Sequence, residues 1–283
     1  MTAHRQFCSR DIDTVADALI HAVCADEAEA MIRARLTLDA KAAIPHAVYF
    51  DVEFKRLGPY ERRWKLMLHA LWADEMAIVL ANLKKLKKSA GHKGLADNIL
   101  YPQTPFRNRL SQETRKLLTT MLDDLGQQKL DELDLNIAFD VSNPQVQEWL
   151  KDYSFKFSKN LEAVSSDKIR AILETGMAEG KSVPELMHDI RETFDNMSRY
   201  RSEIIARTET SRASNQAAVE AYKQSGVVEQ KQWLTAPDCC DICAELDNVI
   251  VGLDETFFDD DYGDGMAPPR HVNCRGSASA YIE

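Results

Sequence analysis

The chain has 283 residues, of which 45% are hydrophobic and 28% charged, and its formal net charge is −10. This length and hydrophobic content can bury one or two sizeable cores, so we expect a globular protein of about two domains. No stretch approaches the roughly 20 consecutive apolar residues of a transmembrane helix, so no membrane segment is expected. Because the first ten residues are polar, an export signal is not expected either.

The negative charge is concentrated in the second half of the chain. Residues 1–150 carry 20 basic and 21 acidic residues, whereas residues 151–283 carry 15 and 24. Proteins that bind a phosphate backbone gain affinity from Lys and Arg side chains that displace counterions, so they usually show the opposite balance. Tight sequence-specific binding to nucleic acid is therefore not expected.

The first half of the chain predicts helices. Apolar residues recur at spacings of three and four between Ile12 and Val23, and again between Trp64 and Leu83. Lysines after residue 83 suit the negative end of a helix dipole, although a contact with DNA or an acidic protein is an alternative interpretation. Another helix is expected over residues 108–130. We therefore predict an N-terminal helical domain over residues 1–145.

Three further helices are expected in the second half. The first runs over residues 166–179 and ends at Gly180, a residue suited to a helix C-terminus. The next runs over residues 183–194, because Ser182 and Glu185 form a capping-box pattern with a proline in the first turn. The last is long, running from Ser198 to Gly226.

The last of these helices has an unusual predicted core-facing stripe, apolar at both ends and polar in the middle. The stripe consists of Tyr200, Ile204, Thr208, Ser211, Asn215, Ala218 and Tyr222. Arg207 and Glu209 flank its polar part. Because an unpaired buried polar group costs about 1–3 kcal/mol, these side chains should be paired. We predict a structural polar network of Arg207, Thr208, Glu209 and Asn215; an active-site patch is the less favoured alternative.

Two short strands should follow, over residues 227–234 and 248–252, where β-forming residues are frequent. The segment from 235 to 265 contains ten acidic residues and no Lys or Arg. An oxygen-ligand site for a divalent ion is conceivable there, but the spacing does not match an EF-hand, and a solvated loop is the favoured interpretation.

Four residues near the end of the chain have the spacing of a zinc knuckle, namely Cys240, Cys243, His271 and Cys274. Two ligands separated by two residues can reach one ion from a single turn, and two such pairs complete a tetrahedron. Three thiolates and one imidazole leave no position for a water molecule, which is typical of structural rather than catalytic Zn²⁺. Free thiols without a metal are the alternative. Cys239 could compete with Cys240, but only Cys240 has the two-residue gap to Cys243.

Together these elements predict a mainly α protein, in which the N-terminal helical domain is followed by an α+β module over residues 146–283. In this module a helical unit precedes a small zinc-stapled β-sheet, with the knuckle at residues 233–276.

A longer set of motifs in the second half resembles the phage Mu F-like head morphogenesis family. It comprises Ile204 to Thr210, then Ala213, Asn215, Tyr222 and Trp233, the knuckle, and Pro268 to Arg275. The resemblance covers roughly residues 150–283. Two positions depart from the family pattern. Asn248 stands where glycine is usual, which requires only that asparagine adopt a positive φ, and Gly276 stands where a further cysteine is common.

The resemblance implies a minor capsid protein of a tailed phage that is not an enzyme. Family members are associated with the portal vertex and are needed for head assembly, DNA packaging or DNA ejection. The expected partners are the portal protein and, as further candidates, the major capsid or scaffolding protein. The expected location is the virion, inside the capsid or at the portal vertex, and the host cytoplasm during assembly. The alternative is a zinc-dependent enzyme or an ADP-ribosyltransferase-like effector delivered with the DNA.

Overall fold

The computed structural model describes residues 46–86, 103–258 and 265–282. The helical pattern predicted between Ile12 and Val23 and residues 259–264 of the acidic segment lie outside these ranges. Within the described residues the protein is mainly helical with a small sheet, which confirms the predicted fold class.

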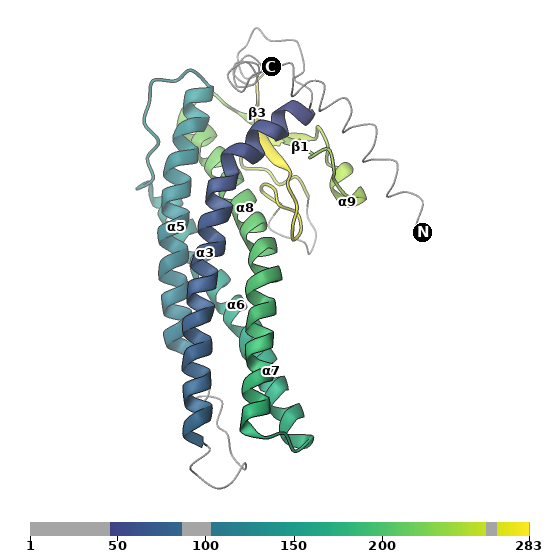
Figure 1. The fold of residues 1–283 in the computed structure, drawn as a ribbon. Helices are drawn as coiled ribbons and strands as arrows, with labels where there is room; N and C mark the ends of the chain where they lie inside the picture. The colour runs from purple at the N-terminus through teal and green to yellow at the C-terminus, as the bar shows by residue number, and fades with distance from the viewer. Residues whose placement is uncertain (1–45, 87–102, 259–264, 283) are drawn as a thin grey trace. The chain divides into compact units, whose positions relative to one another are not determined.

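Five long helices make up most of the part of the chain that the structure describes (Figure 1). Their bounds are α3 His46–Leu86, α5 Gln103–Glu132, α6 Pro144–Ala178, α7 Val183–Asn196 and α8 Ser202–Ser225. The helix predicted at residues 166–179 is wrong at its start, because α6 begins at Pro144. Asn143 caps it by accepting a hydrogen bond from the backbone N–H of Gln145 at 2.9 Å, with proline in the first turn.

Two helix boundaries in the second half, at Gly180 and Ser182, follow the local rules that predicted them, whereas Ser198, the predicted start of the last helix, lies inside a continuous helical run. Gly180 has a φ of 73°, and the N–H of Lys181 donates to the carbonyl of Gly176 at 2.8 Å, which closes the C-terminus of α6. Ser182 and Glu185 form the predicted capping box at the start of α7. Before α8 the chain forms a π-helical turn, η1, over Met197–Arg201.

The sheet has three antiparallel strands in the order β2-β1-β3. Their bounds are β1 Gln230–Leu234, β2 Ile250–Gly252 and β3 Ser277–Tyr281. The two strands expected from the sequence are present, and β3 is an addition that the sequence did not reveal. Central strand β1 pairs Lys231 with Val251 on one side and with Ala280 on the other. Asn248, which precedes β2, has a φ of 64°, so this asparagine adopts the predicted positive-φ turn.

The chain forms two compact units, and several helices contribute residues to both. Unit 1 comprises residues up to 61, 120–141 and 205–283, and unit 2 comprises residues 62–119 and 142–204. This division interleaves segments from both halves of the sequence, whereas the predicted domains, 1–145 and 146–283, divide the chain at one point. The tertiary structure thus groups residues that are far apart in the chain.

Unit 1 contains the sheet and its main core. In Figure 1 the first turns of α3 lie beside β1 and β3, and Tyr49 and Phe50 of α3 share a buried cluster with residues from α8 and the sheet. A second cluster surrounds Trp233, which has no exposed surface. These two clusters hold the sheet against helical residues, which a three-stranded sheet of this size needs for stability.

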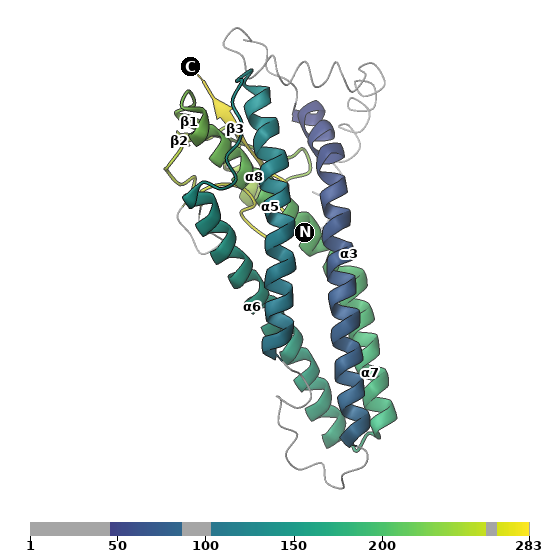
Figure 2. The same ribbon diagram turned by 90° about the vertical axis from the view of Figure 1, so that its left-hand side faces the viewer.

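The described residues of unit 2 form helices and their connections, with no strand among them. Its helices, which Figure 2 shows as ribbons, are joined by contacts between side chains. The ring centroids of Trp64 on α3 and Phe157 on α6 are 5.4 Å apart, and Arg115 of α5 donates to Gln147 of α6. His69 of α3 bonds through Nε2 to Ser202 Oγ at 2.9 Å. Unit 2 is thus a helical bundle with contacts between α3, α5, α6 and the start of α8.

Among the described residues, one helix is long and apolar enough to cross a membrane by length and composition. It is α3, over Tyr49–Lys85, and 39% of its most apolar window is buried inside the protein. Core helices of soluble proteins pass the same test, and this helix carries the buried charged residues Glu53 and Glu75. The helix gives only weak evidence for a membrane span.

Candidate metal centre

The first two candidate ligands lie on one helical turn. Cys240 is the N-cap of the short helix α9, Asp241–Ala244, and Cys243 lies inside it. The N–H groups of Cys243 and Ala244 both donate to the carbonyl of Cys240, at 3.1 and 3.0 Å. Residues three apart on such a turn project to the same side, so the two thiols lie on the same side of this turn.

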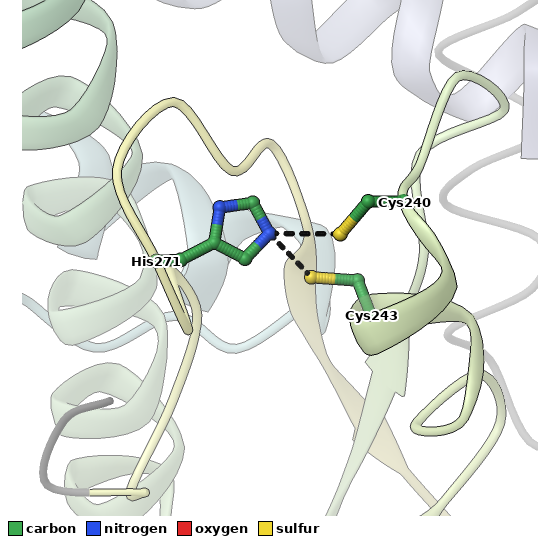
Figure 3. A group of neighbouring side chains, drawn as sticks. All are labelled: Cys240, Cys243 and His271. Atoms are coloured by element: carbon green, nitrogen blue, oxygen red, sulfur yellow. Dashed lines mark hydrogen bonds between the residues drawn. The ribbon is translucent and has the colours of Figure 1, made fainter. Parts of the chain in front are cut away.

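The third candidate ligand reaches these thiols from a distant segment (Figure 3). His271 Nε2 lies 3.0 Å from Cys240 Sγ and 3.1 Å from Cys243 Sγ. The three ligand atoms lie within 4.8 Å of one another, a geometry that could hold a metal ion. His271 Nδ1 is 2.9 Å from the carbonyl oxygen of Val272. An N–H at Nδ1 donated to this carbonyl leaves Nε2 as the nitrogen available to a metal.

Cys274 lies next to this group rather than at its centre. Its Sγ is 3.5 Å from Cys243 Sγ, and its side chain is buried. The structure therefore brings all four predicted ligands into one neighbourhood, with three of them in the tighter cluster. A cavity of about 200 Å³ adjoins them and is also lined by the exposed Cys239.

The thiols differ in acidity because they bond to one another. The hydrogen bond from Cys243 lowers the pKa of Cys274 to about 6, against the effect of burial. The same bond, followed by burial, raises the pKa of Cys243. Burial alone would raise the pKa of Cys240, but the N–H of Cys243 and His271 lower it overall. The site thus already stabilises thiolate at two of its sulfurs, and thiolate is the form that binds metal.

The segment between His271 and Cys274 is docked on α8 by the predicted polar stripe. Asn273 has a φ of 66°. Its N–H donates to Thr208 Oγ1 at 2.8 Å, and its side-chain oxygen accepts a hydrogen bond from Arg207 at 3.1 Å. Asn273 was not among the predicted site residues, although an asparagine in a short turn between two ligands is a usable signal for a positive-φ position.

Asn215 docks the next residues of the chain. Its side chain accepts a hydrogen bond from the N–H of Ala278 at 2.6 Å and donates to the carbonyl of Gly276 at 3.1 Å. A Cβ atom at Gly276 would lie 3.2 Å from Nε1 of Trp233, so a larger residue there would press on the indole. Asn215 thus fixes the path between the metal centre and β3.

The remaining members of the stripe behave differently. Glu209 is buried and lies 4.0 Å from Arg212 Nε. The prediction that Tyr200 and Ile204 face the core is wrong, since they are 62% and 42% exposed. The π-helical turn shifts the phase of the helix at Tyr200, and the docked knuckle segment contacts α8 at Arg207 and Thr208.

Fold and site together define a helical protein with a C-terminal Cys/His module. Residues 167–279 match the family model described as Phage Mu protein F like protein. The predicted family resemblance is therefore confirmed for this segment, which contains all four candidate ligands and the polar stripe from Arg207 onward. The match associates the chain with phage head morphogenesis.

Part of the chain is similar in sequence to a curated protein. The chain is 24% identical over 162 residues to a protein of Bacillus subtilis (strain 168) described as "Uncharacterized protein YqbB". The alignment covers 56% of this chain and 53% of that protein, so the chain matches about half the length of this relative. No solved structure matches the chain significantly.

Proposed function

We propose that Cys240, Cys243, His271 and Cys274 bind one structural Zn²⁺ ion. The observation that carries this proposal is the convergence of three ligand atoms within 4.8 Å, with Cys274 Sγ 3.5 Å from one of them. Thiolate sulfur and imidazole nitrogen are the ligands that Zn²⁺ takes in closed tetrahedral sites. With four protein ligands no position remains for a reactive water, so the ion would act in folding and not in catalysis.

The ion would join two segments whose other links include the β1–β3 pairing and the apolar cluster around Trp233. One carries α9 between β1 and β2, and the other leads into β3. The strands are only five, three and five residues long, and small sheets of this size depend on what packs against them. A Zn²⁺ ion shared between the segments, together with Asn215 and Thr208 on α8, would fix the sheet of unit 1 in one arrangement.

At the level of the particle, we infer a non-enzymatic minor capsid protein that acts in head assembly, DNA packaging or DNA ejection at the portal vertex. The match of residues 167–279 to the Phage Mu F-like family supports this role. The proposed partners are the portal protein and the major capsid or scaffolding protein, and the N-terminal helices predicted over residues 1–145 would make the attachment. The net charge of −10 suits a protein that works beside packaged DNA without capturing it.

The metal proposal is tested by elemental analysis of the purified full chain and of three variants, in each of which one cysteine is replaced by serine. We expect about one zinc per chain, lost in Cys240→Ser and Cys274→Ser. Cys239→Ser is the matched control, because Cys239 is exposed, adjacent to Cys240 and outside the ligand cluster. Loss of zinc from the control and not from Cys240→Ser would contradict the ligand assignment.

The same variants test the structural role of the ion. Structural zinc contributes on the order of 10 kcal/mol to the folding of small modules. Hydrogen exchange should therefore accelerate over residues 230–282 when zinc is removed, and the peptides of unit 2 should keep their protection. If exchange over residues 230–282 is the same before and after chelation of zinc, the ion does not stabilise the sheet.

The role in the particle is tested by removing the gene product from phage production and by co-purification with the portal protein. We expect fewer infectious heads without the protein, rescue by the wild-type chain and by Cys239→Ser, and poor rescue by Cys240→Ser. Particles that form, package and infect normally without the protein would contradict the proposal.

A further inference from the structure

Glu75 is a carboxylate in the interior of unit 2 whose charge is poorly compensated. It lies on α3 with no exposed surface, and neither of its side-chain oxygens has a hydrogen-bond partner. The nearest cation is Arg109 of α5, whose Nη2 lies 3.6 Å from Oε2. This distance allows an ion pair but is too long for a hydrogen bond.

A second buried carboxylate belongs to the same unit. Glu162 of α6 is 4% exposed, its Oε1 has no hydrogen-bond partner, and its Oε2 lies 3.6 Å from Arg107 of α5. Both arginines are partly exposed, at 30% and 41%, so they reach these carboxylates from the bundle surface. Other buried polar atoms without a hydrogen bond in the described part of unit 2 are Trp64 Nε1, Trp72 Nε1, Thr114 Oγ1, Ser166 Oγ and Arg201 Nη1.

An ionised carboxylate in this setting is costly. Each of its oxygens can accept two hydrogen bonds, and water or protein donors normally supply them. A buried charge without such donors is more expensive than the neutral acid, which carries its own O–H donor. Burial therefore raises the pKa of Glu75 to about 7; Arg109 opposes this shift, and the negative charges of Glu162 and Asp74 reinforce it.

We propose that Glu75 is a proton-dependent latch, which keeps its proton while α3 is packed against α5 and α6 and opens this packing locally when the proton is lost. The charged groups around it come from each of these helices: Asp74 on α3, Arg109 on α5 and Glu162 on α6, with Arg107 beside Glu162. Opening would let water supply the hydrogen bonds that the closed bundle lacks.

The direction of the pH effect follows from proton binding. In the closed bundle Glu75 binds its proton with a pKa of about 7, whereas in the opened state the ordinary value of 4.5 applies. The closed state is therefore most stable below pH 4.5 and loses stability as the pH rises toward 7, with no further change above. Between these limits the opening equilibrium should rise about tenfold per pH unit, or about 300-fold in all.

Hydrogen exchange of the full chain between pH 5 and 8.5, corrected for the intrinsic exchange rate, tests the latch. Protection of peptides that cover residues 70–80 should fall with rising pH in the wild-type protein and stay constant in Glu75→Gln, which keeps the shape of the side chain and removes the charge. Asp74→Asn is the matched control, because Asp74 is the neighbouring residue, is exposed and also contacts Arg109. Equal pH dependence in the wild type and in Glu75→Gln would overturn the proposal.

A second measurement on the unmodified chain does not depend on any variant folding well. The side-chain carboxyl carbon of Glu75, labelled with ¹³C and assigned by the resonance missing from Glu75→Gln, should titrate with a midpoint near 7. A midpoint near 4.5 would overturn the latch. The proposal does not depend on the proposed zinc site, since the residues probed belong to unit 2 and the zinc experiments report on residues 230–282.

Discussion

The two units treat buried charge in opposite ways. In unit 1 the ammonium group of Lys129, which is 3% exposed, lies 3.0 Å from Glu53 and 2.9 Å from Glu132, and Arg56 contacts both carboxylates. In unit 2 Glu75 and Glu162 have arginines at 3.6 Å and oxygens without hydrogen bonds. Burial of a charge therefore does not by itself determine its contribution to stability, because that contribution depends on the hydrogen bonds that the charged group makes.

The unit 1 cluster also joins parts of the chain that are distant in sequence. Glu53 and Arg56 belong to α3, and Lys129 and Glu132 to α5. Burial alone would lower the pKa of Lys129, but Glu132 raises it overall. Burial likewise would raise the pKa of Glu132, but Lys129 and Arg56 lower it overall. Each group thus keeps its charge because its partners are in place.

The largest expected effect comes from breaking the unit 1 cluster. Lys129→Met should destabilise unit 1 by about 3–5 kcal/mol, because it leaves two buried carboxylates with only Arg56. Chemical denaturation followed by a probe in the sheet measures the change. Lys116→Met serves as the control, since Lys116 is an exposed α5 lysine paired with Glu113. Equal stability of the two variants would show that the cluster is not a source of stability.

A smaller effect is expected where the sheet is docked on α8. Asn215→Ala removes the partners of the Ala278 N–H, which lies in β3, and of the Gly276 carbonyl, which directly precedes β3. An unsatisfied buried group costs about 1–3 kcal/mol, so a loss of roughly 2 kcal/mol is expected. The measurement is the denaturation midpoint of the zinc-loaded chain. Gln216→Ala on the same helix, whose side chain bonds only within α8, should cost less.

The same substitution should have opposite signs in the two units. Glu132→Gln removes a charge with hydrogen-bonded partners and should destabilise unit 1 by roughly 1–2 kcal/mol. Glu75→Gln removes a charge without hydrogen bonds and should stabilise unit 2 above pH 7 by up to about 3 kcal/mol, which is the 300-fold change in the opening equilibrium expressed as a free energy. The pH profiles should also differ in direction. Because the pKa of Glu132 is lowered, its contribution is present above its ordinary value of 4.5 and is lost as the pH falls below it.

Unit 2 should instead weaken as the pH rises from about 4.5 to 7, since the pKa of Glu75 is raised. Residue-resolved hydrogen exchange on one sample separates the two profiles. If stability changed with pH in the same direction in both units, the distinction between buried charges with and without hydrogen bonds would be contradicted.

The smallest effect is expected for an exposed pair of α3. Lys55 Nζ lies 2.6 Å from Asp51, and its side chain is 64% exposed. Exposed pairs at this helical spacing contribute about 0.3–0.5 kcal/mol, and salt screens them. Lys55→Ala should therefore change stability by no more than this amount in thermal unfolding, and less at high salt. If Lys55→Ala lost as much stability as Lys129→Met, burial and hydrogen bonding would not explain the different contributions of these two lysines.

The sequence alone predicted the features that depend on neighbours in the chain. The capping box at Ser182, the glycine at position 180, the positive φ of Asn248 and the cysteine pair on one turn are all local, so the residue types decide them. The family resemblance was readable for the same reason, because its motifs are short and have fixed spacing. The start of α6 at Pro144 was missed although Asn143 and Pro144 form a local start signal.

Only the tertiary structure decided which distant residues share an environment. Strand β3 was not predicted because its five residues, Ser277–Tyr281, have little intrinsic strand character and become a strand by pairing with β1. The pairing of Lys129 and the lack of hydrogen bonds at Glu75 likewise depend on which groups other helices bring near them. Local conformation is set by the few residues around each bond, whereas the cost of a buried charge is set by every group that packs against it.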